Sequence, residues 1–297
     1  MRTRLLLVVA VVAAAILAVP AMLWWLDGPD LTGTGDADLA FACPEPDAPA
    51  SHADADSIPT GANAVLLCRG PGNHFQEPAD ALETNVDDLV ELVNTQPDQE
   101  RPDGCTDEMG IGYRLVFGYP DGTAMDLTGQ MYGCDHFQVG DTNKQNPHLL
   151  WDFVISGLQD QRSSSTPPGA PGLPECGDRT RSTSVIGRSS EMTRAVMCPF
   201  FFRQRDVGRD GSAMFSDADL AGLLADQADT ERTGDQFPDA DCAQDRREFD
   251  IVGVTAWGDA VSLDGICGFL HDEDGYWAPG AQAQAVIDRL YDEADLG

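Results

Sequence analysis

The sequence predicts an α+β protein in which an N-terminal transmembrane helix is followed by two tandem, small, disulfide-stapled β-α-β-β-α domains. Three observations lead to this prediction. The chain opens with one long apolar run, its eight cysteines fall into two sets of four, and the residues around those cysteines recur in the same order. A length of 297 residues is enough for one large domain or two ordinary ones.

Residues 1–26 are typical of a signal anchor. A short segment with Arg2 and Arg4 precedes Leu5–Leu26, which carries no charge. As a helix this run would be about 33 Å long, and the hydrocarbon core of a bilayer is about 30 Å thick. Trp24 and Trp25 close the run, and aromatic side chains favour the boundary between lipid and water. We therefore expect a helix that crosses the membrane once.

The alternative to a retained anchor is a cleaved signal peptide. Val19–Ala21 offers small residues for a peptidase, but the apolar run is longer than the roughly 7–15 residues usual in signal peptides. The positive charges at the N-terminus predict that this end stays in the cytoplasm and that residues 27–297 are exported. The expected location is the cell membrane with an extracytoplasmic C-terminal region or, after cleavage, outside the cell.

An even number of cysteines in an exported chain predicts disulfides. The cysteines are Cys43, Cys68, Cys105 and Cys134 in the first set, and Cys176, Cys198, Cys242 and Cys267 in the second. Cys105–Cys134 and Cys242–Cys267 would each clamp the base of a hairpin, which leaves Cys43–Cys68 and Cys176–Cys198, although each set allows three pairings. The cysteine pairs of structural zinc sites, two to four residues apart, are absent from the sequence.

The sequence around the two cysteine sets suggests an internal repeat. The matching segments, in chain order, are Ala64–Cys68 with Ala195–Cys198, Asp88–Val93 with Asp219–Leu224, Tyr113–Tyr119 with Phe249–Thr255, and Val154–Leu158 with Val286–Leu290. Identity is low, but the order and the spacing are kept. We therefore expect a first repeat at 41–158 and a second at 173–297, with a polar stalk at 27–40 and a Ser/Pro/Gly linker at 159–172.

The first repeat shows the spacing of each expected element. Apolar residues recur at helical spacing over Val86–Val93, with Thr84 or Asn85 as the N-terminal cap. Alternating apolar residues and a Pro-Asp-Gly turn predict a hairpin. The expected elements are a strand at Val65–Cys68, hairpin strands at Tyr113–Tyr119 and Ala124–Tyr132, and a closing helix at His148–Leu158.

The second repeat follows the same order. The expected elements are a strand at Ala195–Phe202, a helix capped by Ser216 and ending near Gln227, a hairpin over Phe249–Gly268, and a helix at Ala281–Glu293. In each repeat a three-stranded antiparallel or mixed sheet with both helices on one face would bury the apolar sides of the helices.

The charge excludes one class of function. The chain has 50 acidic and 18 basic residues, for a net charge of −32. A protein that binds nucleic acid through its own charge needs a basic face, so we exclude nucleic acid as a partner. The acidic surface is mainly a solvated face, and the alternative interpretation is a cationic partner or Ca²⁺.

Two acidic loops offer carboxylates that could bind a metal ion. Asp206–Asp217 resembles a calcium-binding EF-hand loop, but Gly208 stands at the third position and Asp217 replaces the bidentate Glu at the twelfth. His271–Gly275 is interpreted as a polar turn. We therefore assign no metal ligand and no cofactor.

No residue is assigned a catalytic role. The phosphate-binding, dinucleotide-binding, zinc-hydrolase and serine-hydrolase sequence motifs are absent. His136 and His271 each follow the fourth cysteine of a set, and a catalytic role for either would need a partner that the sequence does not show. Trp257, Tyr276 and Trp277 could form an exposed patch for carbohydrate or peptide, although packing over a disulfide is the favoured interpretation.

The anchor, the stalk and the paired Ala-Val/Cys, Asp-Leu and hairpin-Cys segments resemble membrane-anchored or secreted actinobacterial proteins with tandem four-cysteine repeats. The resemblance implies a cell-envelope context and no particular activity. We expect a single-pass cell-envelope protein whose extracytoplasmic region binds a ligand or protein, and we favour binding over catalysis. The alternatives are an exported hydrolase with a site in the interdomain groove and a calcium-stabilised adhesion module.

Overall fold

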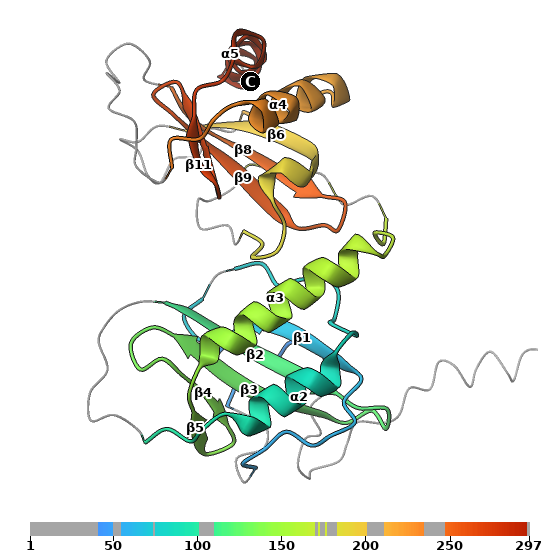
Figure 1. Ribbon diagram of the computed structural model, residues 1–297. Coiled ribbons are helices and arrows are strands. Elements are labelled where there is room, and N and C mark those ends of the chain that lie inside the picture. Colours follow the sequence, from blue (N-terminus) through green and yellow to red (C-terminus); the bar gives the residue numbers. More distant parts are fainter. Residues whose placement is uncertain are drawn as a thin grey trace, which may run out of the picture. The chain divides into compact units, whose positions relative to one another are not determined.

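A computed structural model describes residues 41–49, 55–73, 75–100, 110–169, 172, 176, 183–200, 211–234 and 247–295 of the chain (Figure 1). Both sheets described below belong to one compact unit, residues 38–297. The protein is α+β, as expected. The expected anchor and stalk lie outside the described residues, within which no helix has the length and apolar character needed to cross a membrane.

The first sheet has five antiparallel strands in the order β1-β2-β3-β4-β5. They are β1 (Ala64–Arg69), β2 (Ile111–Gly118), β3 (Ala124–Met131), β4 (His136–Val139) and β5 (Thr142–Lys144). Each strand pairs with the next one along the chain, so the order in space follows the order in sequence. The first three strands coincide with the predicted ones to within two residues at each end.

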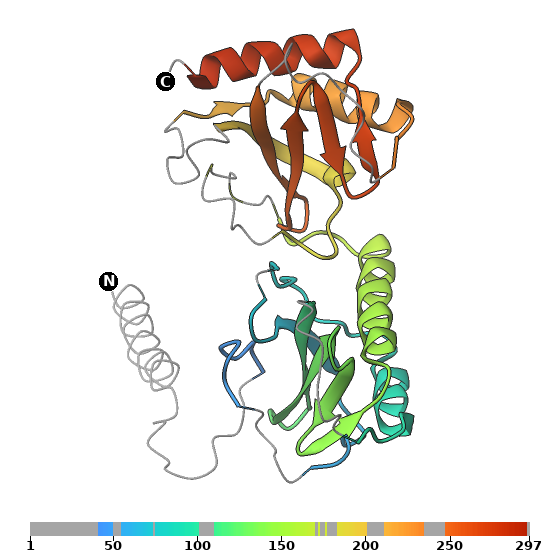
Figure 2. The same cartoon turned by 90° about the vertical axis from the view of Figure 1, so that its left-hand side faces the viewer.

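Two helices, α2 (Val86–Thr95) and α3 (Pro147–Ser163), cover one face of the first sheet, and no helix of the described residues lies on the other face (Figure 2). The buried side chains of α2 are Val86, Leu89, Val90 and Val93, at the predicted helical spacing. The predicted cap is only partly right. Asn85 is the N-cap residue, but it has left-handed backbone dihedrals and its side chain makes no capping hydrogen bond.

The second sheet has six antiparallel strands in the order β11-β10-β9-β8-β6-β7. They are β6 (Met192–Phe200), β7 (Ala213–Met214), β8 (Glu248–Thr255), β9 (Ala260–Ile266), β10 (Phe269–Asp272) and β11 (Gly275–Trp277). A short 3₁₀ helix, η1 (Ser189–Glu191), precedes β6. Apart from the edge strand β7, the strand order matches that of the first sheet.

The helices α4 (Asp217–Asp229) and α5 (Ala281–Asp295) lie on one face of the second sheet (Figure 2). Ser216 is the N-cap of α4, as predicted, and its hydroxyl accepts a hydrogen bond from the backbone N–H of Asp219 at 3.2 Å. Leu220, Leu223 and Ile287 are among the buried residues that join these helices to the sheet. Placement of both helices on one face of each sheet is therefore confirmed.

The predicted three-stranded sheets are too small, because each half has an additional hairpin, β4–β5 or β10–β11. These strands have only three or four residues, so the apolar alternation that is present, as in Phe137 and Val139 of β4, is too short to mark a strand in the sequence. The turn from β9 to β10 is two residues long, and both Cys267 (φ 53°) and Gly268 (φ 80°) have positive φ. Such dihedrals suit the tight turns that join paired strands.

Helix α3 continues past the predicted end at Leu158 to Ser163, into the segment interpreted as a linker. The reason is tertiary contact. The Gln161 side chain accepts a hydrogen bond from the backbone N–H of Glu83 at 2.8 Å and donates one to the carbonyl of Ala81 at 2.7 Å. Arg162, one residue further on, is buried between two aspartates. A polar sequence therefore remains helical because its side chains are held by neighbouring elements.

Candidate functional site

A cavity of about 430 Å³ is lined by residues of the first sheet and of the loops beside it, and we call it the first-sheet cavity. The strands β2, β3 and β4 supply its floor. The floor side chains are those of Arg114, Thr128, Gln130, His136 and Gln138. A volume in this range is usual for sites that bind small molecules, about 300–1,000 Å³.

Strand register explains why these side chains gather on one face. Arg114 pairs with Thr128, which pairs with Gln138, and the neighbouring pair is Gln130 with His136. Side chains alternate between the faces of a sheet, so the intervening residues point the other way. Leu115, Leu127 and Phe137 are accordingly buried in the core beneath the helices.

Loops form the walls of the first-sheet cavity. Pro49 comes from the segment that leads to β1, Pro71 and Asn73 follow β1, and Asp141 lies in the β4–β5 turn. The described part of the lining contains no Phe, Tyr, Trp, Leu, Ile, Val or Met side chain. It combines hydrogen-bonding side chains with glycine backbone, proline rings and Ala48.

Arg114 is the most unusual residue of the floor, because it is charged and only 1% exposed. Its Nη1 lies 3.4 Å from Oδ2 of Asp126, which is also 1% exposed, and its Nη2 donates a hydrogen bond to the carbonyl of Ala48. No described residue accepts a hydrogen bond from Nε or Nη1. A buried donor without an acceptor costs about 1–3 kcal/mol, so the arrangement calls for an explanation.

No protein-family model, no curated protein and no solved structure matches this chain.

The two histidines considered for catalysis lie in different settings. His136 is on β4 and lines the first-sheet cavity. His271 is on β10, where its ring lies 4.2 Å from that of Tyr276 and its Nδ1 lies 3.9 Å from Oδ2 of Asp264. A third, His148 at the start of α3, has Nε2 3.1 Å from Oδ1 of Asp135. His136 and His271, which each follow the fourth cysteine of a set, therefore have different surroundings.

A second cavity, of about 260 Å³, is lined by residues of both halves of the described chain, among them Arg162, Arg188, Glu191 and Trp257. Two of its charged side chains already have partners. The Arg162 guanidinium contacts Asp80 and Asp259 and lies 5.0 Å from the centre of the Trp257 ring, and Glu191 accepts a hydrogen bond from the backbone N–H of Arg188. No histidine or cysteine is among the described residues of the lining. The contacts of Arg162 are structural.

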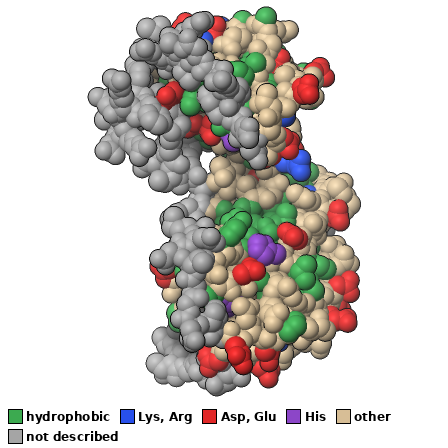
Figure 3. Space-filling view, turned by 60° about the vertical axis from the view of Figure 1, so that its left-hand side comes forward, with side chains coloured by type: hydrophobic (Ala, Val, Ile, Leu, Met, Phe, Trp, Pro, Cys, Tyr) green, Lys and Arg blue, Asp and Glu red, His purple; other side chains and the backbone are tan. Residues whose placement is uncertain are grey.

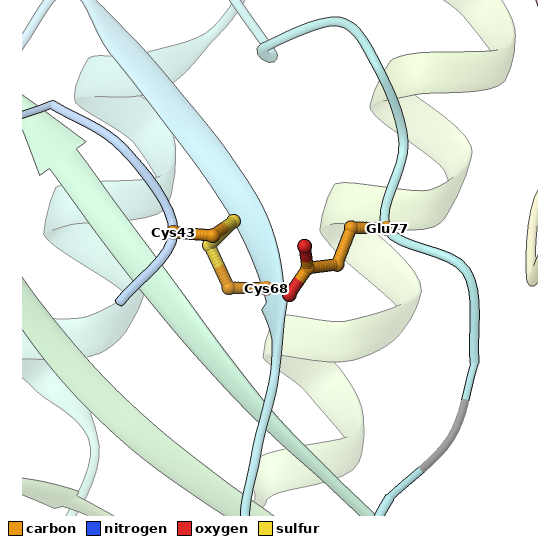
Figure 4. A group of neighbouring side chains, drawn as sticks. All are labelled: Cys43, Cys68 and Glu77. Atoms are coloured by element: carbon orange, nitrogen blue, oxygen red, sulfur yellow. A yellow bond between two sulfur atoms is a disulfide. The ribbon is translucent and has the colours of Figure 1, made fainter. Parts of the chain in front are cut away.

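The acidic loops do not form a metal site within the described residues. Only Cys43, Cys68 and Glu77 bring three possible ligand atoms within 4.8 Å of one another there, and Figure 4 shows the Glu77 side chain pointing toward the two cysteines. The sulfurs are bonded to each other, and Glu77 accepts a hydrogen bond from the Arg69 backbone at 2.9 Å. A disulfide offers no thiolate to a metal.

In the His271–Gly275 segment, Asp272 is buried and accepts hydrogen bonds from Gln227 at 2.7 Å and Arg232 at 3.0 Å. The segment is the turn that joins β10 to β11, as interpreted. In the EF-hand-like loop, Asp206 and Asp210 lie outside the described residues.

The alternative of an exposed patch of Trp257, Tyr276 and Trp277 is wrong, because Trp277 is buried. Trp277 is fully buried in the core of the second sheet, where the Cζ of Arg232 lies 4.2 Å from the centre of its ring. Trp257 lies against Arg162 instead.

Both disulfides that involve only described cysteines match the expected pairs. Cys43 is bonded to Cys68 and Cys176 to Cys198. Cys134 and Cys267 are also disulfide-bonded, and Cys105 and Cys242 lie outside the described residues, so the two hairpin pairings stay predictions. No cysteine in the described ranges is free. Arg2, Arg4, Trp24 and Trp25 are likewise outside those ranges.

The sequence interpretation missed Arg114, Asp126, Thr128 and Gln138. A signal was present, because Arg114 interrupts an otherwise apolar strand and Asp126 stands across the same hairpin. Two opposite charges in adjacent strands of one hairpin can face each other when the register allows it. Finding the cavity needed the loops as well, and these come from distant parts of the chain.

Proposed function

We propose that this protein is a cell-envelope binding protein and that the first-sheet cavity is its binding site. The observation that carries the proposal concerns Arg114, whose side chain is buried at the floor of the cavity. No described residue accepts a hydrogen bond from its Nε or its Nη1. A group that accepts hydrogen bonds in the cavity would remove the cost of leaving these donors unmet. The floor combines a guanidinium, two amides, a hydroxyl and an imidazole, and these groups can hold a polar ligand by hydrogen bonds.

The cellular context supports the proposal from a separate side. Disulfides persist in oxidising compartments outside the cytoplasm, and the structure contains Cys43–Cys68 and Cys176–Cys198. With an anchor at 5–26, the binding region would stand on the outer side of the membrane. We further propose that the two sheets are copies of one ancestral unit, because their strand order agrees from β1 to β5 and from β6 to β11 once β7 is set aside.

The experiment is a thermal-shift screen of the full-length, oxidised chain against small neutral, anionic and cationic compounds. The comparison variant is Arg114→Lys, which keeps a positive charge beside Asp126 but loses Nε and the forked guanidinium. At a concentration of 100 times Kd, a ligand stabilises the folded state by about 2.7 kcal/mol.

We expect at least one compound to raise the melting temperature of the wild type by several degrees and that of Arg114→Lys by much less. Circular dichroism of the variant without ligand checks that it is folded. If every compound that stabilises the wild type stabilises folded Arg114→Lys equally, or if none stabilises the wild type, the proposed site is wrong.

A further inference from the structure

We infer that the ligand of the first-sheet cavity is a small, uncharged saccharide. The inference rests on the proposed function and adds the chemical class of the ligand. Three properties of the cavity lead to it: a balanced charge, a lining with three side-chain amides and one hydroxyl, and a volume suited to a compact molecule.

The charge of the cavity disfavours an anion. The Arg114 guanidinium is already balanced by Asp126 at 3.4 Å, and both side chains are buried. An anion bound at Arg114 would lie close to the Asp126 carboxylate, where a low dielectric makes repulsion between like charges strong. Asp141 on the wall adds a further negative charge, and the chain as a whole carries −32. The face of the molecule in Figure 3 likewise shows many more acidic than basic side chains.

The hydrogen-bond donors at the floor of the cavity disfavour a cation as the ligand. Arg114 presents N–H donors for which no described residue is an acceptor. A cation such as an ammonium group brings further donors and a charge of the same sign as that of Arg114. What fits these N–H groups is a neutral acceptor, either a hydroxyl or a carbonyl oxygen.

The remaining side chains offer amide oxygens and one rotatable hydroxyl. The amide nitrogen of Gln138 donates to the carbonyl of Gly140 at 2.7 Å, and that of Asn73 donates to the carbonyl of Pro71 at 3.1 Å. These bonds orient both amides and leave their oxygens for a ligand. Thr128 adds a hydroxyl at the centre of the floor, opposite Arg114 in the register. A ligand with many hydroxyl groups, each both donor and acceptor, matches this mixture.

The second sheet shows why binding should be confined to the first. In the first sheet the disulfide cysteine of the first strand, Cys68, pairs with Arg114 on the neighbouring strand. In the second sheet the corresponding cysteine, Cys198, pairs with Asp250. On the next strand Arg114 pairs with Thr128 in the first sheet, and Asp250 pairs with Asp264 in the second. The helix-free face of the second sheet therefore carries carboxylates where the first carries a guanidinium and a hydroxyl, and we expect one ligand per chain.

The test is isothermal titration calorimetry of the full-length, oxidised chain. The probes are neutral mono- and disaccharides, each measured beside the uronic acid and the amino sugar of the same ring. We expect at least one neutral sugar to bind with a stoichiometry near one, and its charged counterparts to bind at least 10-fold more weakly. The key variant is Thr128→Val, which keeps the shape of the side chain but removes its hydroxyl. It should weaken binding of that sugar about 10-fold.

The matched control is Thr142→Val on β5 of the same sheet, outside the cavity lining, which should bind like the wild type. Equal affinities for the two variants would overturn the placement of the sugar in this cavity. If a charged compound binds more tightly than every neutral sugar and depends on Arg114, the saccharide inference falls while the binding function stands. If no compound binds at all, the proposed function falls with it.

Discussion

The guanidinium of Arg162 on α3 lies 2.6 Å from the carboxylate of Asp259, at the turn between β8 and β9. The same guanidinium reaches Asp80 through Nη2 at 2.6 Å and Nε at 3.1 Å. Asp259 also accepts hydrogen bonds from the hydroxyls of Thr255 and Ser184. Burial acts to lower the pKa of Arg162, but the hydrogen bonds and charges of Asp80 and Asp259 together raise it by more. The pKa therefore ends above its ordinary value, and the side chain stays charged.

We expect Arg162→Ala to lower the free energy of unfolding by about 3–5 kcal/mol, because Asp259, only 2% exposed, would be left as a buried charge without its cation. Urea denaturation at pH 7 measures the loss. Arg289→Ala is the control, since Arg289 pairs with Asp219 and Glu293 on the surface and its removal should change little. Equal losses for the two variants would contradict the structural role of Arg162.

The stability of the protein should fall as the pH rises above about 10. Burial, with help from the charges of Asp135 and Asp152, raises the pKa of Tyr113 far above its usual value, and burial together with Asp121 raises the pKa of Tyr119 to about 12. The unfolded chain therefore releases these protons first, near pH 10, so that rising pH favours unfolding from that point.

Tyr113→Phe separates this effect from general alkaline loss. At pH 7 the variant should lose about 1–3 kcal/mol, because the Tyr113 hydroxyl donates to the carbonyl of Pro147 at 2.7 Å in a buried setting. Between pH 10 and 12 its stability should decline less steeply than that of the wild type. Tyr132→Phe, which changes a half-exposed side chain, serves as the control in the same pH series of urea titrations. A decline for Tyr113→Phe as steep as that of the wild type would be inconsistent with this assignment.

Two Gly→Ala substitutions should change stability in opposite directions. A Cβ at Gly129 on β3 would lie 2.1 Å from Cζ of Tyr113, so Gly129→Ala should cost about 1–3 kcal/mol by overpacking the core. A Cβ at Gly222 in α4 meets nothing within 4 Å, and Gly222→Ala should add up to about 1 kcal/mol because alanine favours a helix. Thermal denaturation followed by circular dichroism compares the two, and a stabilising Gly129→Ala would contradict the packing described.

Removing the Cys43–Cys68 disulfide should lower the free energy of unfolding by about 3 kcal/mol, since the bridge closes a loop of 25 residues in the unfolded chain. The variant is Cys43→Ala with Cys68→Ala, measured by urea denaturation under oxidising conditions. Peptide mapping of the non-reduced wild type should recover Cys43 linked to Cys68 and Cys176 linked to Cys198. Recovery of bridges between the two cysteine sets would be incompatible with the structure.

Local sequence patterns predicted several elements well. The helical spacing over Val86–Val93 corresponds to α2, the alternation over Tyr113–Tyr119 to β2, and the cap at Ser216 to the start of α4. These elements depend on interactions between residues close in the chain, and a period of 3.6 or 2 is visible in a short window. The edge hairpins β4–β5 and β10–β11 were not predicted because strands of three or four residues are too short to show a period.

The candidate site was harder to predict, for a physical reason. Arg114 belongs to the floor of the cavity only because Asp126 faces it across a hairpin and Ala48 covers it from a loop 66 residues away in the chain. Likewise, Arg162 lies in a polar segment that reads as a linker until Asp80 and Asp259 surround it. Contacts between distant segments determine whether such a charge is solvated or buried.

The sequence by itself determined the α+β class and the principal strands and helices, because periodicity acts over short distances along the chain. Each cysteine set allowed three pairings, and the tertiary structure decided for Cys43–Cys68 and Cys176–Cys198. The tertiary structure decided which polar residues are buried and which of them share a cavity. Register and loop packing bring Arg114, Thr128 and Gln138 together on one face, and burial converts ordinary polar residues into a site with unmet hydrogen-bond donors.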